Sequence, residues 1–303
     1  MDKEGFTAYL ESKEFSRATQ GLYLLKTEMF LKWVGKEDVQ ITKPDILDYL
    51  EYLKNRKKNR NTTRVNVLIA IRHYFAYLFE NDYIVTNPAA LLKIRGTQVK
   101  RIYHIYTNDD LEELYDHYYN IYIRGFEANK YWGNATEAYI RLKRERNYVA
   151  LGILIYQGIM ANELKNIKID DINLQKATLK IASSKQAKER TLPLKAAQMG
   201  TLINYIQNIR PQLNTDEYLF DFEHLSFNDF TKHLTHQIRK IERNFLNFRQ
   251  IRASVITHWL QTKDLRKTQY LAGHRSIQAT ENYQPNNLES LIEDIAKHHP
   301  LNL

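Results

Sequence analysis

Two arginines spaced three residues apart, Arg249 and Arg252, have the clearest chemistry in this sequence. The apolar pattern around them predicts a helix over residues 248–261, and residues at i and i+3 share one helix face. A guanidinium presents paired N–H donors that match phosphate oxygens, and it keeps its charge near neutral pH. The pair could therefore hold one phosphate and neutralise charge that develops on it during a reaction.

Several other chemistries find no support in the sequence. The absence of cysteine removes disulfides, thiolate nucleophiles and thiolate metal sites. Neither the G-x-x-x-x-G-K-[ST] nor the G-x-G-x-x-G pattern occurs, so no nucleotide cofactor is implied. His233 and His236 lack an acidic or cysteine partner at ligand spacing, so we expect surface histidines and no metal. No G-x-S-x-G pattern marks a nucleophilic serine, although a dispersed Ser–His–Asp set stays open.

The charge balance favours a polyanionic partner. The 303 residues carry 44 Lys and Arg against 35 Asp and Glu, and residues 1–101 hold 18 and 12 of these. No acid lies between residues 52 and 79, where the basic residues form a cluster that could neutralise duplex phosphates. An ordinary solvated loop is the alternative. The predicted DNA-binding residues are Lys54, Arg56, Lys57, Lys58, Arg60, Arg64, Lys93, Arg95, Lys100, Arg101 and Arg190.

The pattern of apolar residues predicts a mainly helical protein of two domains. Only 10 Gly and 6 Pro interrupt the chain. Residues 1–97 are predicted to form a four-helix bundle, with helical spacing at Leu22, Leu25, Met29 and Trp33. Residues 98–106 form a basic linker, and residues 107–303 form a second domain with a β-hairpin at 177–192. Its later helices are expected near 195–208, 226–243, 248–261, 263–271, 276–283 and 287–297.

Neither a membrane span nor a secretory signal is predicted. The longest apolar stretch, residues 148–161, is shorter than the roughly 20 residues that a spanning helix needs. Acidic residues stand at the amino terminus where a signal peptide would be apolar. We therefore expect a cytoplasmic protein.

Three segments closely resemble the tyrosine recombinases, the phage-integrase and Xer-like family. Residues 271–283 read LAGHRSIQATENY, similar to the family's L-G-H-x-x-I-x-x-T-x-x-Y pattern. Residues 184–194 resemble the family's hairpin, and residues 158–164, reading GIMANEL, resemble its G-L-R-x-x-E-L box. The resemblance covers nearly the whole chain. It implies a SAM-like core-binding helical bundle followed by an integrase-type catalytic domain, mostly helical, with a small antiparallel sheet.

By this resemblance, Tyr283 would attack a DNA phosphate and Lys185 would protonate the leaving oxygen. Arg252 would neutralise the phosphate, His274 would donate a hydrogen bond to a phosphate oxygen, and Glu163 would orient its neighbours. No cofactor is then required. Double-stranded DNA is the implied partner, with four subunits joined around two duplexes by a C-terminal exchange helix.

Two positions depart from the family pattern. Met160 stands where the family has its first arginine, and Arg249 replaces the histidine of the H-x-x-R box. Methionine cannot donate hydrogen bonds to phosphate, so we hypothesise that Arg249 supplies the missing guanidinium, with Arg190 as a weaker candidate. The leading interpretation is a site-specific recombinase of a mobile genetic element. The alternatives are a recombinase-fold DNA-binding protein with weak or lost catalysis and, last, an RNA-binding helical protein.

Overall fold

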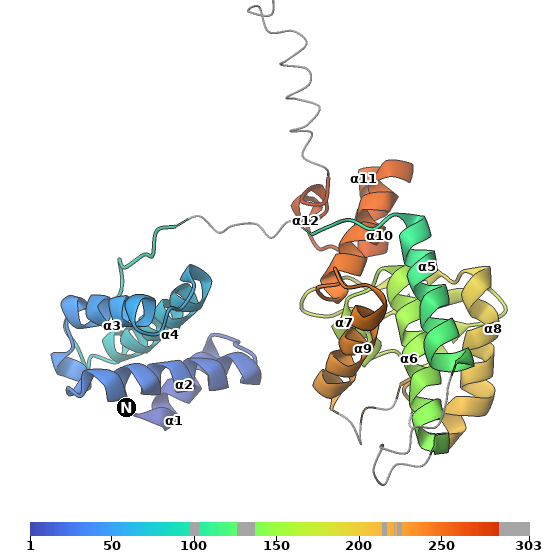
Figure 1. Cartoon of the computed structure of the whole chain (residues 1–303). Coiled ribbons are helices and arrows are strands. Elements are labelled where there is room, and N and C mark those ends of the chain that lie inside the picture. The colour runs from blue at the N-terminus through green and yellow to red at the C-terminus, as the bar shows by residue number, and fades with distance from the viewer. Residues whose placement is uncertain (97–102, 126–136, 214–216, 221, 223–225, 285–303) are drawn as a thin grey trace, which may run out of the picture. The chain divides into compact units, whose positions relative to one another are not determined.

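The chain forms two compact units, Met1–Arg101 and Ile102–Leu303, each with its own hydrophobic core (Figure 1). The computed structural model describes residues 1–96, 103–125, 137–213, 217–220, 222 and 226–284. Part of the predicted linker, residues 98–102, lies outside these ranges. Tyr106 falls within the predicted linker range, but it is buried in the second core, and its N–H donates to Ser254 Oγ over 2.9 Å. The packing of the second unit therefore begins before Thr107.

The first unit is a helical bundle, as predicted. Its helices are α1 (Lys3–Ser12), α2 (Arg17–Val34), α3 (Lys43–Asn55) and α4 (Asn61–Glu80), with a short 3-10 turn at Asp38–Gln40. Local capping explains where two of them begin. The Ser16 hydroxyl accepts the Thr19 N–H before α2, and Asp45 accepts the Thr42 N–H before α3. Helix α4 packs against α1, α2 and α3.

Helix α2 packs with a different face from the one that its apolar spacing suggests. Its buried residues are Gln20, Thr27 and Phe30. The side chains of Leu22, Leu25, Met29 and Trp33 are 40–56% exposed. Because α2 carries apolar residues on opposite sides, the spacing predicts a helix correctly but does not decide which side contacts the core.

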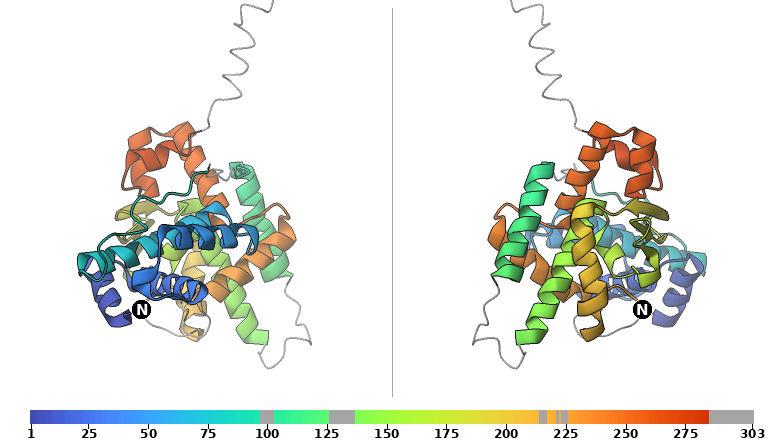
Figure 2. Two further views of the ribbon diagram at one scale, coloured as in Figure 1. Left: turned by 90° about the vertical axis from the view of Figure 1, so that its left-hand side faces the viewer. Right: turned by 90° about the vertical axis from the view of Figure 1, so that its right-hand side faces the viewer.

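The second unit surrounds one long, mostly buried helix. Helix α6 (Glu137–Gln157) packs against α5 (Asn108–Tyr118), α8 (Ala196–Asn204) and α10 (Phe248–Thr262), and its contact with α5 can be followed in Figures 1 and 2. The other helices of this unit are α7 (Ala161–Leu164), α9 (Phe227–Ile241), α11 (Leu265–Ala272) and α12 (Ile277–Glu281). Two π-helical segments, Tyr119–Arg124 and Tyr205–Ile209, extend α5 and α8. The second lies mostly within the helix predicted at 195–208, but the π-helical geometry of both was not predicted. Short 3-10 turns lie at Ile169–Asp171 and Arg210–Gln212.

A small antiparallel sheet confirms the predicted hairpin. Its strands are β1 (Ile172–Asn173), β2 (Thr178–Ile181) and β3 (Arg190–Pro193), in the order β1-β2-β3. Leu179 pairs with Leu192 and Ile181 pairs with Arg190, so these four side chains share a face and all are buried. The alternation of β3 thus turns Arg190 toward the protein interior. The first strand, which is only two residues long, was not predicted.

The predicted C-terminal exchange helix at 287–297 lies outside the described residues. In the part of the chain that the structure describes, no helix is both long and apolar enough to cross a bilayer.

Candidate active site

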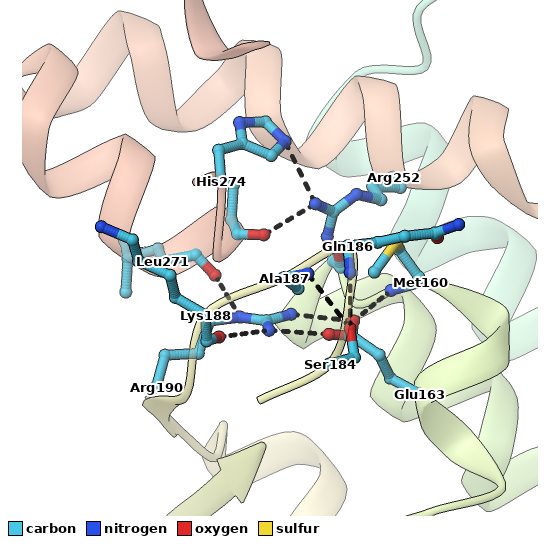
Figure 3. Close-up of polar contacts among 12 residues, drawn as sticks. Met160, Glu163, Ser184, Gln186, Ala187, Lys188, Arg190, Arg252, Leu271 and His274 are labelled. Carbon is cyan, nitrogen blue, oxygen red and sulfur yellow. Dashed lines mark hydrogen bonds and ion pairs between the residues drawn. The ribbon is translucent and has the colours of Figure 1, made fainter. Parts of the chain in front are cut away.

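Arg252 is the buried centre of the site. It lies on α10, is 6% exposed, and donates to the backbone oxygens of Gly158 and Ala272, each over 2.7 Å (Figure 3). Burial lowers the pKa of Arg252, whereas the Glu163 carboxylate and the Tyr283 hydroxyl raise it. A carbonyl just after α6 and a carbonyl at the end of α11 thus hold the Arg252 guanidinium in one orientation.

Glu163 and Arg190 form a buried, two-pronged ion pair next to Arg252. The two terminal nitrogens of Arg190 lie 2.8 and 2.9 Å from the two carboxylate oxygens of Glu163 (Figure 3). Arg190 Nε donates to the Leu271 carbonyl over 2.9 Å, and Glu163 also accepts the Met160 N–H over 2.7 Å. This pair ties β3 to α7 and to the end of α11. It agrees with the orienting role expected for Glu163, a role that stays a prediction.

Arg190 was predicted to contact DNA, and the structure places it elsewhere. Its side chain is 1% exposed, and three of its N–H groups are engaged by Glu163 and Leu271. Gly273 is adapted to this neighbour, because a Cβ there would lie 2.6 Å from Arg190 Nη1. Gly273 also ends α11 at φ +69°, a conformation that glycine adopts at little cost.

His274 follows Gly273 and contacts Arg252 directly. Its Nε2 lies 3.2 Å from Arg252 Nη2, and its Nδ1 lies 2.9 Å from Thr280 Oγ1. Burial is the main cause that lowers the pKa of His274 to about 4, and Arg252 and Arg190 lower it further. The ring is therefore neutral at pH 7, whereas a donor to phosphate through Nε2 would need a proton on that atom.

Tyr283 lies just beyond α12 with its ring against His274. The two ring centroids are 5.6 Å apart and the planes differ by 15°. The Tyr283 N–H donates to the Thr280 carbonyl over 3.0 Å, which continues the last turn of α12. Tyr283 is also among the groups that raise the pKa of Arg252, after Glu163. The structure therefore brings together Arg252, His274 and Tyr283.

Lys185 is exposed in the turn between β2 and β3. The turn is closed by the Ser184 N–H, which donates to the Ala187 carbonyl over 2.8 Å. Ala187 forms an isolated antiparallel β-bridge with His274, and the Arg275 side chain donates to the Ser184 carbonyl over 2.6 Å. The turn that carries Lys185 is thus attached to the segment after α11, beside the site.

The two departures from the family pattern lie in different surroundings. Met160 is half-buried, and its side chain offers no donor. Arg249 is exposed on the first turn of α10, and among the described residues its side chain forms no hydrogen bond or ion pair. The two arginines were predicted to share one helix face, but Arg252 is buried in α10 whereas Arg249 is exposed at its first turn.

The cations predicted to bind DNA in the first unit are mostly on its surface. Arg64 is partly buried and hydrogen-bonds to Asn61. Lys100 and Arg101 lie outside the described residues. The exposed members are Lys54, Arg56, Lys57, Lys58, Arg60, Lys93 and Arg95.

Comparisons with known proteins agree with this arrangement. Residues 127–289 match the model of the phage integrase family, and residues 4–84 match the phage integrase N-terminal SAM-like domain. The chain therefore belongs to the phage integrase family, the tyrosine recombinases.

Relatives are similar to the chain over nearly its whole length. The tyrosine recombinase XerC of Staphylococcus saprophyticus is 25% identical, covering 95% of this chain and 93% of the relative. The tyrosine recombinase XerA of Pyrococcus furiosus is 27% identical, covering 92% and 87%. A lambda integrase dimer bound to a COC′ core site has the same fold, with a TM-score of 0.67 at 15% identity over 93% of this chain and 94% of that one.

Sequence reasoning did not assign a role to Thr280 and did not find the partner of Arg190. Thr280 is fully buried and contacts His274, and Arg190 pairs with Glu163. The threonine of the T-x-x-Y pattern could have pointed to Thr280. The Arg190–Glu163 pair joins residues 27 positions apart, so no local sequence pattern indicates it.

Proposed function

We propose that this chain is a site-specific recombinase that cuts and rejoins DNA through a 3′-phosphotyrosyl intermediate. The observation that carries the proposal is the stacking of Tyr283 on His274, whose Nε2 faces the buried Arg252 guanidinium. A phosphodiester is anionic, so attack by an oxygen needs cations at the non-bridging oxygens. Arg252 supplies a preorganised guanidinium there.

In the proposed reaction the Tyr283 oxygen bonds to phosphorus and the bond from phosphorus to the 5′-oxygen breaks. The leaving oxygen takes a proton from Lys185 in the hairpin turn. The covalent link conserves the energy of the phosphodiester, so that a 5′-hydroxyl from another strand can reverse the step. Double-stranded DNA is the proposed partner, with the exposed cations of the first unit contacting its phosphates.

We further propose that the chain acts as a homo-oligomer, with four subunits on two duplexes. A lambda integrase, whose fold this chain shares, has been solved as a dimer on a core site and as a tetramer bound to a Holliday junction. A mobile element is the proposed source, and a relative, the TnP I resolvase of Bacillus thuringiensis, is 24% identical over 94% of this chain.

Covalent capture tests the reaction. A pool of nicked duplexes, randomised over the binding arms, is incubated with the protein, and adducts that survive denaturation are recovered and sequenced. We expect adducts on a restricted set of sequences, and their complete loss in Tyr283→Phe. Lys185→Ala should slow capture by about 10²–10⁴-fold. Adducts that persist in Tyr283→Phe would refute the role of Tyr283.

A DNA-binding protein with little or no catalysis is the second candidate. Met160 favours it, because its side chain cannot replace a lost arginine and Arg190 is already paired with Glu163. This candidate predicts salt-sensitive duplex binding without any adduct.

The exposed Arg249 is the proposed replacement for the missing guanidinium. If it reaches the phosphate when DNA binds, Arg249→Ala should lower the capture rate far more than the affinity at matched salt. Arg243→Ala, which removes another exposed arginine of the second unit, is the control. Equal losses of rate and affinity, or no loss, would exclude Arg249 as the replacement. Arg190 would then be the candidate, and it would first have to separate from Glu163.

A further inference from the structure

The turn that carries Lys185 is closed by the polar groups of Ser184. The Ser184 N–H donates to the Ala187 carbonyl over 2.8 Å, and Ser184 Oγ accepts the N–H groups of Gln186 and Ala187 over 3.2 and 3.1 Å (Figure 3). The third polar group of Ser184, its carbonyl oxygen, accepts a hydrogen bond from Arg275 Nη2 over 2.6 Å. Ser184 thus uses two groups inside the turn and one to join the turn to the segment after α11.

Arg275 holds the side of this turn that the main-chain contacts leave open. After Lys185, the turn is attached to residues 273–275 by its backbone, because the Lys188 N–H donates to that segment over 2.9 Å and Ala187 forms a β-bridge with it. Before Lys185, the contact with that segment which the described residues provide is the bond from Arg275. The turn is therefore held on both sides of Lys185, and on one side by a single side chain.

The Ser184 carbonyl and the Lys185 nitrogen belong to the same planar peptide unit. Because this unit is rigid, a partner that holds its oxygen also fixes the position of the Lys185 Cα. The Lys185 side chain is exposed, and a flexible four-carbon stem joins its Cα to the ammonium. A general acid must come within about 3.2 Å of the atom that it protonates. The position of the backbone therefore decides whether the ammonium can reach that atom.

Direct contact with DNA is the alternative role for Arg275. Its side chain is exposed and borders a hollow of about 320 Å³ beside His274, together with the cations Lys188 and Arg266. Among the contacts of the described residues, the Arg275 side chain differs from the other two in donating to the backbone of the Lys185 turn. This bond favours a role through the turn, and the experiment below distinguishes the two roles.

We infer that Arg275 is a positioning residue that acts through Lys185: it holds the Ser184 carbonyl so that the Lys185 ammonium reaches the leaving 5′-oxygen. The inference rests on the proposed recombinase reaction. The proton passes from Lys185 Nζ to the 5′-oxygen as the bond from that oxygen to phosphorus breaks, which leaves a neutral amine. In rejoining, the amine takes a proton back from the attacking 5′-hydroxyl. Arg275 itself transfers no proton and touches no reacting atom.

The leaving group separates a role through Lys185 from a role at the phosphate. On one duplex selected by covalent capture, the 5′-oxygen that leaves is replaced by sulfur. A thiol has a pKa of about 8.5 in cysteine, so sulfur leaves as a thiolate without a proton, whereas an alkoxide is far more basic and needs one. Lys185→Ala should therefore be slow on the oxygen duplex and near the parental rate on the sulfur duplex.

Arg275→Ala should follow the pattern of Lys185→Ala on a smaller scale. We expect its capture rate to fall about fivefold to tenfold on the oxygen duplex, because one exposed hydrogen bond is lost, and to stay within about twofold of the parent on the sulfur duplex. Arg275→Lys keeps a donor and should retain most of the rate on oxygen. Arg252→Lys, which weakens charge stabilisation at the phosphate, should stay slow on both duplexes.

Arg266→Ala is the matched control. Arg266 is exposed beside the same hollow, and its side chain donates to Gln269 over 3.2 Å. This variant should keep the parental rate with either leaving group. Equal losses for Arg275→Ala on oxygen and sulfur would mean that Arg275 contacts the phosphate or the duplex, and no loss on oxygen would mean that Lys185 is positioned without it. Either result would overturn the inference.

Hydrogen exchange tests the contact without DNA. In the full-length protein, the amide protons of Ser184 and Ala187, which bond within the turn, should exchange about fivefold faster in Arg275→Ala than in the parent. Arg266→Ala should leave both rates unchanged. Parental exchange in Arg275→Ala would show that the turn keeps its order without the contact, and it would count against the inference.

The two proposals fail in different ways. Absence of adducts in the parent protein with both leaving groups would count against the recombinase reaction and leave the exchange measurement intact. Adducts that depend on Tyr283 and Lys185, but form at the parental rate in Arg275→Ala, would count against the positioning role alone. Thermal unfolding of each variant shows whether a lost rate reflects lost folding, in which case the comparison of Arg275→Lys on oxygen and sulfur decides.

Discussion

The basic cluster of the first unit and three buried arginines of the second unit are held in opposite ways. In the first unit the basic residues between Lys54 and Arg60 are exposed, and these side chains form no ion pair among the described residues. In the second unit Arg146, Arg190 and Arg252 are at most 6% exposed. Arg190 pairs with a carboxylate, Arg252 donates to carbonyls, and Arg146 lies 5.1 Å from the Phe230 ring.

The difference separates attraction from orientation. Exposed cations act through the summed field, which salt screens, and they suit many phosphates along a duplex. Buried guanidinium groups are expensive to desolvate and must be held by partners, so each has one orientation. Such a group can stabilise charge at one phosphorus atom without reorganising. Four predictions test this division, from the largest expected effect to the smallest.

Breaking the buried ion pair should be costly for folding. Glu163→Ala leaves Arg190 charged and buried, and the loss of one partner from such a pair costs about 3–5 kcal/mol. Urea unfolding measures the change. Glu189→Ala is the matched control, because its pair with Lys180 is exposed and is expected to contribute about 0–1 kcal/mol. Similar losses in both variants would remove the distinction between the two classes of cation.

Replacing the buried Arg252 guanidinium by a lysine ammonium should affect catalysis more than binding. Arg252→Lys cannot present paired donors, and loss of one preorganised donor costs about 10²–10³-fold in rate. We expect this loss in phosphotyrosyl capture, with duplex affinity nearly unchanged. Arg243→Lys, at an exposed position, should change neither. If Arg252→Lys weakens affinity as strongly as rate, the buried arginine serves mainly in attraction.

Removing two exposed cations should have the reverse effect. Lys57→Ala with Lys58→Ala should weaken duplex binding and reduce the slope of log affinity against log salt by about 2, because each phosphate contact contributes about 0.9. The capture rate of the saturated complex should not change. Lys43→Ala, which alters an exposed lysine outside the cluster, is the control. An unchanged salt slope would support the alternative that the basic cluster is an ordinary solvated loop.

Stability should depend on pH through His274. Its pKa is about 4 in the folded protein and near 6.5 in the unfolded chain. Between these values the unfolded chain binds more protons, so stability is complete above pH 6.5 and falls as the pH drops toward 4. The ring is half-buried, so we expect a loss on the order of 1 kcal/mol after solvent screening. Urea unfolding at pH 7.5 and 4.5 should show a smaller difference for His274→Asn, and an equal difference would assign the effect to other groups.

Much of the fold follows from local patterns. The helix starts after Ser16, Thr42 and Thr107 come from capping side chains and periodicity, and the hairpin comes from alternation in β2 and β3. These signals depend on neighbours within a few residues, so the sequence contains them directly. The exposed apolar side of α2 shows their limit, since periodicity does not say which of two apolar faces the core will take.

By itself, the sequence determined the helical content, the hairpin, the family resemblance and the chain order of Lys185, Arg252, His274 and Tyr283. Only the tertiary structure decided that Arg190 turns inward to Glu163, that Arg249 stays outside while Arg252 is buried, and that Thr280 lies buried against His274. The reason is physical. Burial and the pairing of polar groups depend on segments that meet only in the folded chain, and the free energy of desolvation then selects which donors and acceptors must be satisfied.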